Sequence, residues 1–179
     1  MLTPLLVVCL DDVLHVSELV QIAITAALPI LVMPFVIQPW ARFLDRHHVI
    51  VYRSVHAWVA VSGSALLVFA VLARIPILLW PGALLMGISL AAGSLGWSLG
   101  HNDFAPRGEE TRYMALHVTL TGLRGLIAPP AAIVAYHGLQ RLWPGTEAWA
   151  LLLPAALIAS GAWQFTLLRR LRESAVGSA

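Results

Sequence analysis

Charge is scarce in this sequence. Only 11% of its 179 residues are charged, whereas a soluble domain carries about 25%, and 59% are hydrophobic. Lysine is absent, so all eleven basic residues are arginines. This composition excludes the water-soluble classes of protein and predicts an integral membrane protein, with the lipid bilayer as its first partner. The net charge of +2 gives no support for nucleic-acid binding, since most arginines lie between the apolar runs.

Patterns that membrane enzymes and metal proteins need are also missing. Cys9 is the only cysteine, which excludes an internal disulfide and a CxxC metal or redox motif. The sequence has no HExxH motif, and no apolar run contains two carboxylates that could do acid–base work. His47 and His48 are adjacent, so on a helix they point about 100° apart and make a poor chelate. We therefore expect no enzyme, no metal site and no cofactor.

Long apolar runs are what the chain does have. A run of about 20 apolar residues crosses the roughly 30 Å of hydrocarbon in a bilayer, and five runs reach this length. Residues 1–10 are also apolar but are too short to cross. We predict one all-α transmembrane domain over residues 1–179, a polytopic bundle with a partial helix at 1–10 and spans at about 18–40, 50–73, 76–100, 113–137 and 147–168.

The arginines predict how these spans are oriented. Loops that stay in the cytoplasm are enriched in Lys and Arg. Eight arginines fall on one side of the predicted topology, in the first and third inter-span loops and after the last span, and only Arg74 and Arg141 fall in loops of the other side. We expect an inner-membrane protein of a bacterium with its N-terminus outside and its tail, 169–179, in the cytoplasm.

One arginine lies inside a span. Arg124 is about 18 Å along the helix from Arg112, close to the middle of the bilayer, where a guanidinium costs roughly 3 kcal/mol. No span contains an acid that could balance it. The counter-charge could be an anionic ligand, an absent polypeptide, or backbone carbonyls with water. Residues three and four apart share a helix face, so the candidate cavity residues beside Arg124 are Thr121, His117 and Tyr113, with Gln21 of the first span as a further candidate.

The first inter-span loop carries the most specific local pattern, Ala41-Arg42-Phe43-Leu44-Asp45-Arg46-His47-His48, followed by Arg53. It resembles the loop signature of the major facilitator superfamily, in which an Asp-Arg pair lies between two glycines and a basic cluster follows the second glycine. Ala41 and His48 occupy positions where glycine is usual. The resemblance implies that Asp45 pairs with basic side chains and a neighbouring helix end as a cytoplasmic latch, with Arg46, Arg42 and Arg53 in the same set. A charged turn that only sets topology is the alternative.

The number of spans extends this resemblance. A half-transporter of this family has six helices with both ends in the cytoplasm, and the chain resembles the C-terminal half, truncated within its first helix. The resemblance implies secondary transport of a small solute by alternating access, with a missing N-terminal half or a second copy as partner. Arg124 favours an anionic or zwitterionic solute, although structural pairing of Arg124 stays open. The alternative function is a non-transporting accessory subunit or an inactive transporter fragment.

Overall fold

The computed structural model describes residues 2–100 and 103–177, with side chains described through residue 174. These residues form helices and turns, and no strand occurs among them. Five helices are long and apolar enough to cross a membrane, which confirms the predicted all-α bundle. In chain order the elements are α1 (Leu2–Asp12), α2 (Glu18–Ile22), the π-helix η1 (Ala23–Ala27), α3 (Leu28–Arg46), α4 (Val49–Leu72), η2 (Pro76–Leu78), α5 (Leu79–Leu99), α6 (Glu110–Leu142), η3 (Glu147–Leu151) and α7 (Leu152–Gly177).

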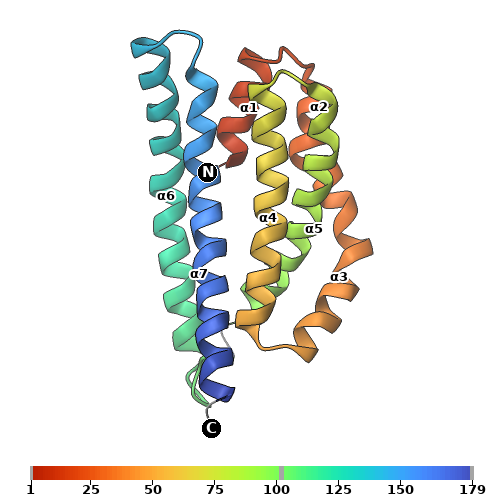
Figure 1. Cartoon of the computed structure of the whole chain (residues 1–179), viewed down its shortest axis with the longest axis vertical. Coiled ribbons are helices and arrows are strands. Elements are labelled where there is room, and N and C mark those ends of the chain that lie inside the picture. The colour runs from red at the N-terminus through yellow and green to blue at the C-terminus, as the bar shows by residue number, and fades with distance from the viewer. Residues whose placement is uncertain (1, 101–102, 178–179) are drawn as a thin grey trace.

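Each predicted span coincides with one of the five long helical segments. The segments run over Glu18–Arg46, Val49–Leu72, Pro76–Leu99, Glu110–Leu142 and Glu147–Ser174. The first, fourth and fifth continue well past the predicted ends, because their polar ends remain helical outside the apolar stretch that hydropathy detects. Successive segments alternate in direction, so the connections gather at two ends of the bundle (Figure 1).

The two ends differ in charge. We call the end with the α3–α4 turn, the α5–α6 loop and the C-terminus the arginine-rich end; it lies at the bottom of Figure 1. It carries Arg42, Arg46, Arg53, Arg107, Arg112, Arg169, Arg170 and Arg172. The far end carries only Arg74 and Arg141. The charge asymmetry predicted from the sequence is therefore an asymmetry between two ends of one helical bundle.

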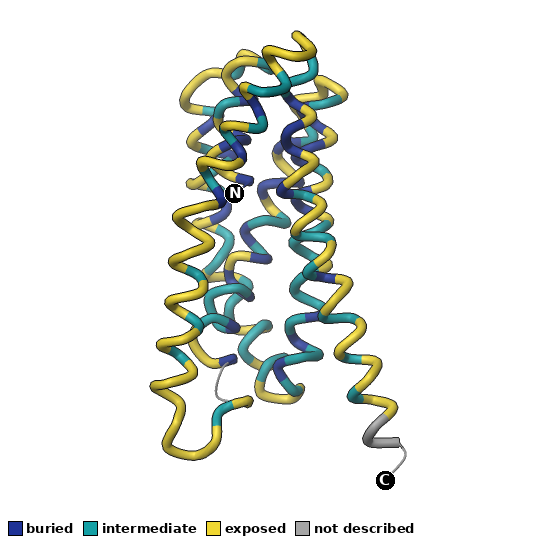
Figure 2. The backbone as a smooth tube through the Cα atoms, turned by 90° about the vertical axis from the view of Figure 1, so that its left-hand side faces the viewer, coloured by how far each residue is buried: buried dark blue, intermediate teal, exposed yellow. Residues whose placement is uncertain are grey.

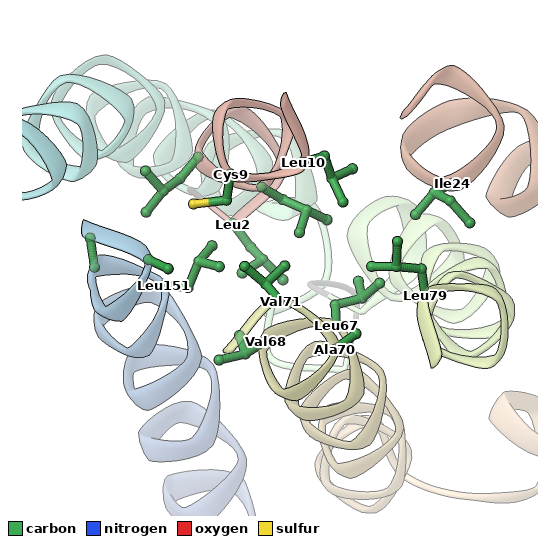
Figure 3. Close-up of a cluster of buried hydrophobic side chains, with 14 of the residues drawn as sticks. Leu2, Cys9, Leu10, Ile24, Leu67, Val68, Ala70, Val71, Leu79 and Leu151 are labelled. Atoms are coloured by element: carbon green, nitrogen blue, oxygen red, sulfur yellow. The ribbon is translucent and has the colours of Figure 1, made fainter. Parts of the chain in front are cut away.

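The short helix α1 forms the centre of the core. At about 1.5 Å per residue it is roughly half as long as a membrane span. Its buried side chains pack against α4, α6 and η3 (Figure 3), and α1 lies toward the far end of the bundle (Figure 1). Figure 2 shows that the helices are mostly exposed or half-buried at the arginine-rich end. The buried residues of α1 are Leu2, Leu5, Leu6, Cys9 and Leu10.

Helix α5 lies between α3 and α4 and packs against both, and α4 packs in turn against α7. Glycines allow these close approaches. A Cβ built on Gly87 would lie 2.9 Å from the Cα of Pro29 in α3, and one on Gly82 would lie 2.9 Å from the side chain of Leu67 in α4. Helices in lipid associate largely through such close packing, so α5 holds its two neighbours through residues without side chains.

The first long segment changes its helical type part-way. Residues Ala23–Ala27 form a π-helical turn just before Pro29, whose ring nitrogen cannot donate a backbone hydrogen bond. The hydroxyl of Thr25 donates to the carbonyl of Gln21 at 2.7 Å within this stretch. The segment bends visibly along its length (Figure 1), as expected of a π turn followed by prolines.

Helix α6 lies at the edge of the bundle. It joins the core near its C-terminal end, through η3 and α1, and the hydroxyl of Tyr136 donates to Asp12 at 2.7 Å. Only Ala128, Ala132 and Tyr136 are buried along this helix. The other half of α6, toward the arginine-rich end, is mostly exposed, and this is the half that carries the candidate residues.

Candidate functional site

A cavity of about 640 Å³ lies between α4, α5, α6 and α7 in the arginine-rich half of the bundle. Among the described residues, its wall contains two arginines and no acidic residue. The remaining lining is aromatic, aliphatic or glycine. The lining residues are Val49, Arg53, Gly96, Trp97, Gly100, Phe104, Tyr113, Leu116, His117, Leu120, Arg124 and Phe165.

One face of α6 supplies the wall on its side. Spacings of three and four residues place Tyr113, His117 and Arg124 along one stripe, with Leu116 and Leu120 between them. Three of the residues predicted from this spacing therefore line the same cavity. Thr121 is half-buried on the same helix, but it is not among the lining residues.

Of the two arginines, Arg124 lies farther from the arginine-rich end of the bundle. It is roughly 21 Å along α6 from the first helical residue, Glu110, whereas Arg53 lies about one turn into α4. The Arg124 side chain forms no hydrogen bond or salt bridge with any residue that the structure describes. Its guanidinium thus has all its donors available on the cavity side of the helix.

Arg53 is held more firmly. Its Nη2 donates to the carbonyl oxygen of Gly96 in α5 at 2.7 Å. A Cβ on Gly96 would lie 3.0 Å from the guanidinium carbon, so a larger residue at this position would displace the Arg53 side chain. The bond uses only one of the several N–H donors of the guanidinium. The sequence assigned Arg53 to the loop latch, and the structure places it in the cavity wall.

Aromatic rings close the sides of the cavity. The rings of Trp97 in α5 and His117 in α6 have centroids 4.3 Å apart and are tilted by 53°. Phe104 comes from the α5–α6 loop and Phe165 from α7, and Tyr113 is 37% exposed at the start of the α6 stripe. The contact between Trp97 and His117 joins α6 to the rest of the bundle on the side where α6 is otherwise least packed.

Asp45 and Arg46 lie at the α3–α4 turn, beside a second cavity of about 580 Å³, and Arg42 lies one turn earlier in α3. Asp45 and Arg46 line it together with Asp103 of the α5–α6 loop. Among the described residues, neither Asp45 nor Arg46 nor Arg42 takes part in a salt bridge. The three charged side chains lie near the end of α3.

The acid that contacts a helix end here is Asp103. Its Oδ2 accepts a hydrogen bond of 2.8 Å from the backbone N–H of Val49, the first residue of α4. Next to it, Nδ1 of His48 accepts from the N–H of Ile50 at 3.2 Å. The first N–H groups of a helix have no partner within the helix and attract negative charge. Asp103 therefore ties the α5–α6 loop to the start of α4.

Gln21 lies at the far end of the bundle, away from the cavity. Its side chain is buried, and its amide donates to the carbonyl of Val16 at 3.0 Å and to Asp11 at 3.3 Å. These bonds fasten the α1–α2 connection to the first turn of the long segment. The structure thus separates Gln21 from Arg124, His117 and Tyr113.

Sequence reasoning did not single out Trp97 or Asp103 as functional candidates. Trp97 lies within Gly96-Trp97-Ser98-Leu99-Gly100, a stretch that also matches the GxSxG pattern of serine hydrolases. That pattern needs a sharp turn between a strand and a helix. Here Ser98 lies inside α5 and donates to the carbonyl of Ser94 at 3.0 Å, so the stretch has the geometry of a packed helix end.

Comparison with protein-family models, with curated proteins and with solved structures returned no match.

Proposed function

We propose that this chain forms half of a secondary transporter of the major facilitator type, which moves a small solute by alternating access through the cavity between α4, α5, α6 and α7. In this proposal Arg124, with His117 and Tyr113, contacts the solute. The observation that carries it is a guanidinium near mid-depth of a membrane helix, facing a cavity and without a hydrogen-bond or ion-pair partner among the described residues.

An arginine in the middle of a membrane helix costs roughly 3 kcal/mol on insertion scales, so it is retained where it has a use. Arg124 has no structural pair in the part of the chain that is described, which leaves a ligand, another polypeptide or water to balance or solvate its charge. Solute sites in secondary transporters lie near the bilayer midplane, at the depth of Arg124.

The proposed orientation follows from the charge asymmetry. Cytoplasmic loops are enriched in arginine, which supports a bacterial inner-membrane protein with the arginine-rich end and the C-terminus in the cytoplasm. The cavity would then open toward the cytoplasmic side. A second six-helix unit, either an N-terminal half or a second copy of this chain, would cover the exposed face of α6 and complete the path.

Reconstitution into liposomes tests this proposal. Uptake of a panel of labelled carboxylates, amines and sugars is measured for the wild-type chain, for Arg124→Gln and for Arg112→Gln. Arg112 is an exposed residue of the same helix, 3.6 Å from Glu109, and it does not line the cavity, so its variant is a matched control. We expect uptake of an anionic or zwitterionic solute that Arg124→Gln abolishes and Arg112→Gln preserves. Absence of wild-type uptake for the whole panel contradicts transport by copies of this chain alone.

A second proposal concerns the α3–α4 turn. We propose that Asp45 and Arg46 act as a latch at the cytoplasmic face, supported by their position beside Asp103 and the start of α4. Asp45→Asn should change the transport rate and the accessibility of engineered cysteines on the two sides. If neither changes, the turn serves only to set topology.

The alternative is an accessory subunit or inactive fragment that does not transport. The exposed half of α6 favours it, because a permanent partner could cover that face and supply the counter-charge of Arg124. Native mass spectrometry from mild detergent, combined with the uptake panel, separates the two. A stable complex with a second polypeptide and no uptake supports the subunit.

A further inference from the structure

The wall of the cavity selects by charge. Arg53 and Arg124 both line it, and its described wall contains no carboxylate. The acid nearest in sequence to the lining is Asp103, whose carboxylate is engaged with the N–H of Val49. A cationic solute would meet two positive charges here, whereas a carboxylate would find planar guanidinium groups that match its geometry and can bind it in a bidentate manner.

The wall also selects by shape and polarity. Aromatic side chains line it from α5, α6, α7 and the α5–α6 loop, including Trp97, Phe104 and Phe165, and Leu116 and Leu120 of α6 line it as well. Apart from the arginines, the polar side-chain groups of the described wall are those of Tyr113 and His117 and the indole N–H of Trp97. A sugar or another highly hydroxylated solute would lose hydrogen bonds to water that this wall cannot replace. A flat ring would instead gain offset or edge contacts with the aromatic residues.

We propose that the cavity binds an aromatic organic monoanion, a ring system that carries one carboxylate. The carboxylate binds Arg124, Arg53 adds a second positive charge to the same wall, and the ring lies against Trp97. The cavity of about 640 Å³ is within the range of pockets that hold small organic ligands. This assignment deepens the proposed function, because it names the class of solute, but the binding site itself can exist without transport.

An anionic phospholipid has the same combination of an anion and an apolar body. The depth of Arg124, about 21 Å along α6 from its arginine-rich end, favours the smaller solute, because lipid headgroups lie at the membrane surface rather than near its middle. The assay therefore includes membranes with and without anionic lipid, so that a small solute and an anionic phospholipid as the occupant of the cavity give different results.

The experiment measures binding of 1-naphthoate to the purified full chain in nanodiscs of phosphatidylcholine, by isothermal titration calorimetry. The neutral amide, 1-naphthamide, tests the charge, and acetate tests the ring. We expect saturable binding of 1-naphthoate at least about tenfold tighter than of either comparison compound. Arg124→Gln should weaken it by about tenfold or more, and Arg112→Gln should leave it unchanged. Arg124 makes no bond within the described chain, so its replacement removes a ligand contact without removing a fold contact.

Three results would overturn the proposal. The first is equal affinity for 1-naphthoate and 1-naphthamide, which shows that charge does not matter, and which needs no variant. The second is unchanged affinity in Arg124→Gln. The third is loss of 1-naphthoate binding when phosphatidylglycerol is added to the nanodiscs, which assigns the cavity to lipid. If 1-naphthoate binds as expected but no solute is taken up into liposomes, the binding site stands and transport by copies of this chain alone is refuted. If another class of solute is taken up and 1-naphthoate does not bind, transport stands and the assignment to an aromatic monoanion is refuted.

Discussion

The crossing of α3 and α5 leaves no room for a side chain at Gly87. A Cβ at this position would lie 2.9 Å from both the Cα and the carbonyl oxygen of Pro29, and 3.0 Å from the Cβ of Val32. Carbon atoms in contact normally stay about 3.5–4.0 Å apart, so Gly87→Ala requires the two helices to separate by roughly 0.5–1 Å. The obstacle includes backbone and cannot rotate away. Overpacking of this kind costs about 1–3 kcal/mol.

Gly122→Ala is the matched control, because a Cβ on Gly122 of α6 would have nothing within 4 Å. Both changes gain the same helix propensity, so the difference between the two variants isolates the clash. The free energy of unfolding in mixed micelles, measured by circular dichroism during titration with SDS, should be lower for Gly87→Ala by about 1–3 kcal/mol. If the two variants are equally stable, the close crossing of α3 and α5 is refuted.

Three further predictions concern the packing of the ends and of the core. Asp103→Ala removes the partner of the Val49 N–H and should lower the free energy of unfolding by about 1 kcal/mol in the same titration; no change would show that this loop does not hold α4. Tyr136→Phe loses the 2.7 Å bond to Asp12 and should cost about 1 kcal/mol or more, whereas a neutral result would argue that α1 is not fastened to α6 there. Cys9 is 0% exposed, so maleimide should label it only after denaturation in SDS; labelling of the folded protein would contradict the position of α1.

The helices could be predicted from the sequence because the bilayer imposes one length and one polarity on every span. The predicted spans end too early where a polar turn continues the helix, as at residues 137–142 of α6. Hydropathy could not predict that α1 would be the centre of the core. A short apolar helix that is buried in protein and one that faces lipid have the same composition. The close approach at Gly87 depends on which face of α5 meets α3, and hydropathy does not encode this.

Part of the site was predictable for a similar reason. Helical spacing alone places Tyr113, His117 and Arg124 on one face, and the structure finds them on one cavity. Arg53 and Trp97 join them from α4 and α5, whose relative position depends on tertiary packing through Gly96. Gln21 could not be assigned from its sequence because its partner, the α1–α2 connection, is irregular in structure.

The most direct test of the proposed function is cysteine accessibility in the cavity. In a Cys9→Ser background, Leu120→Cys places a thiol on the cavity wall, and Leu126→Cys places one on an exposed part of α6 that does not line it. Both are treated with a membrane-impermeant, negatively charged thiosulfonate in right-side-out and in inside-out vesicles. Alternating access predicts modification of the Leu120→Cys thiol from both sides and no modification of the Leu126→Cys thiol from either. A Leu120→Cys thiol that reacts from one side only, or from neither, contradicts alternating access through this cavity.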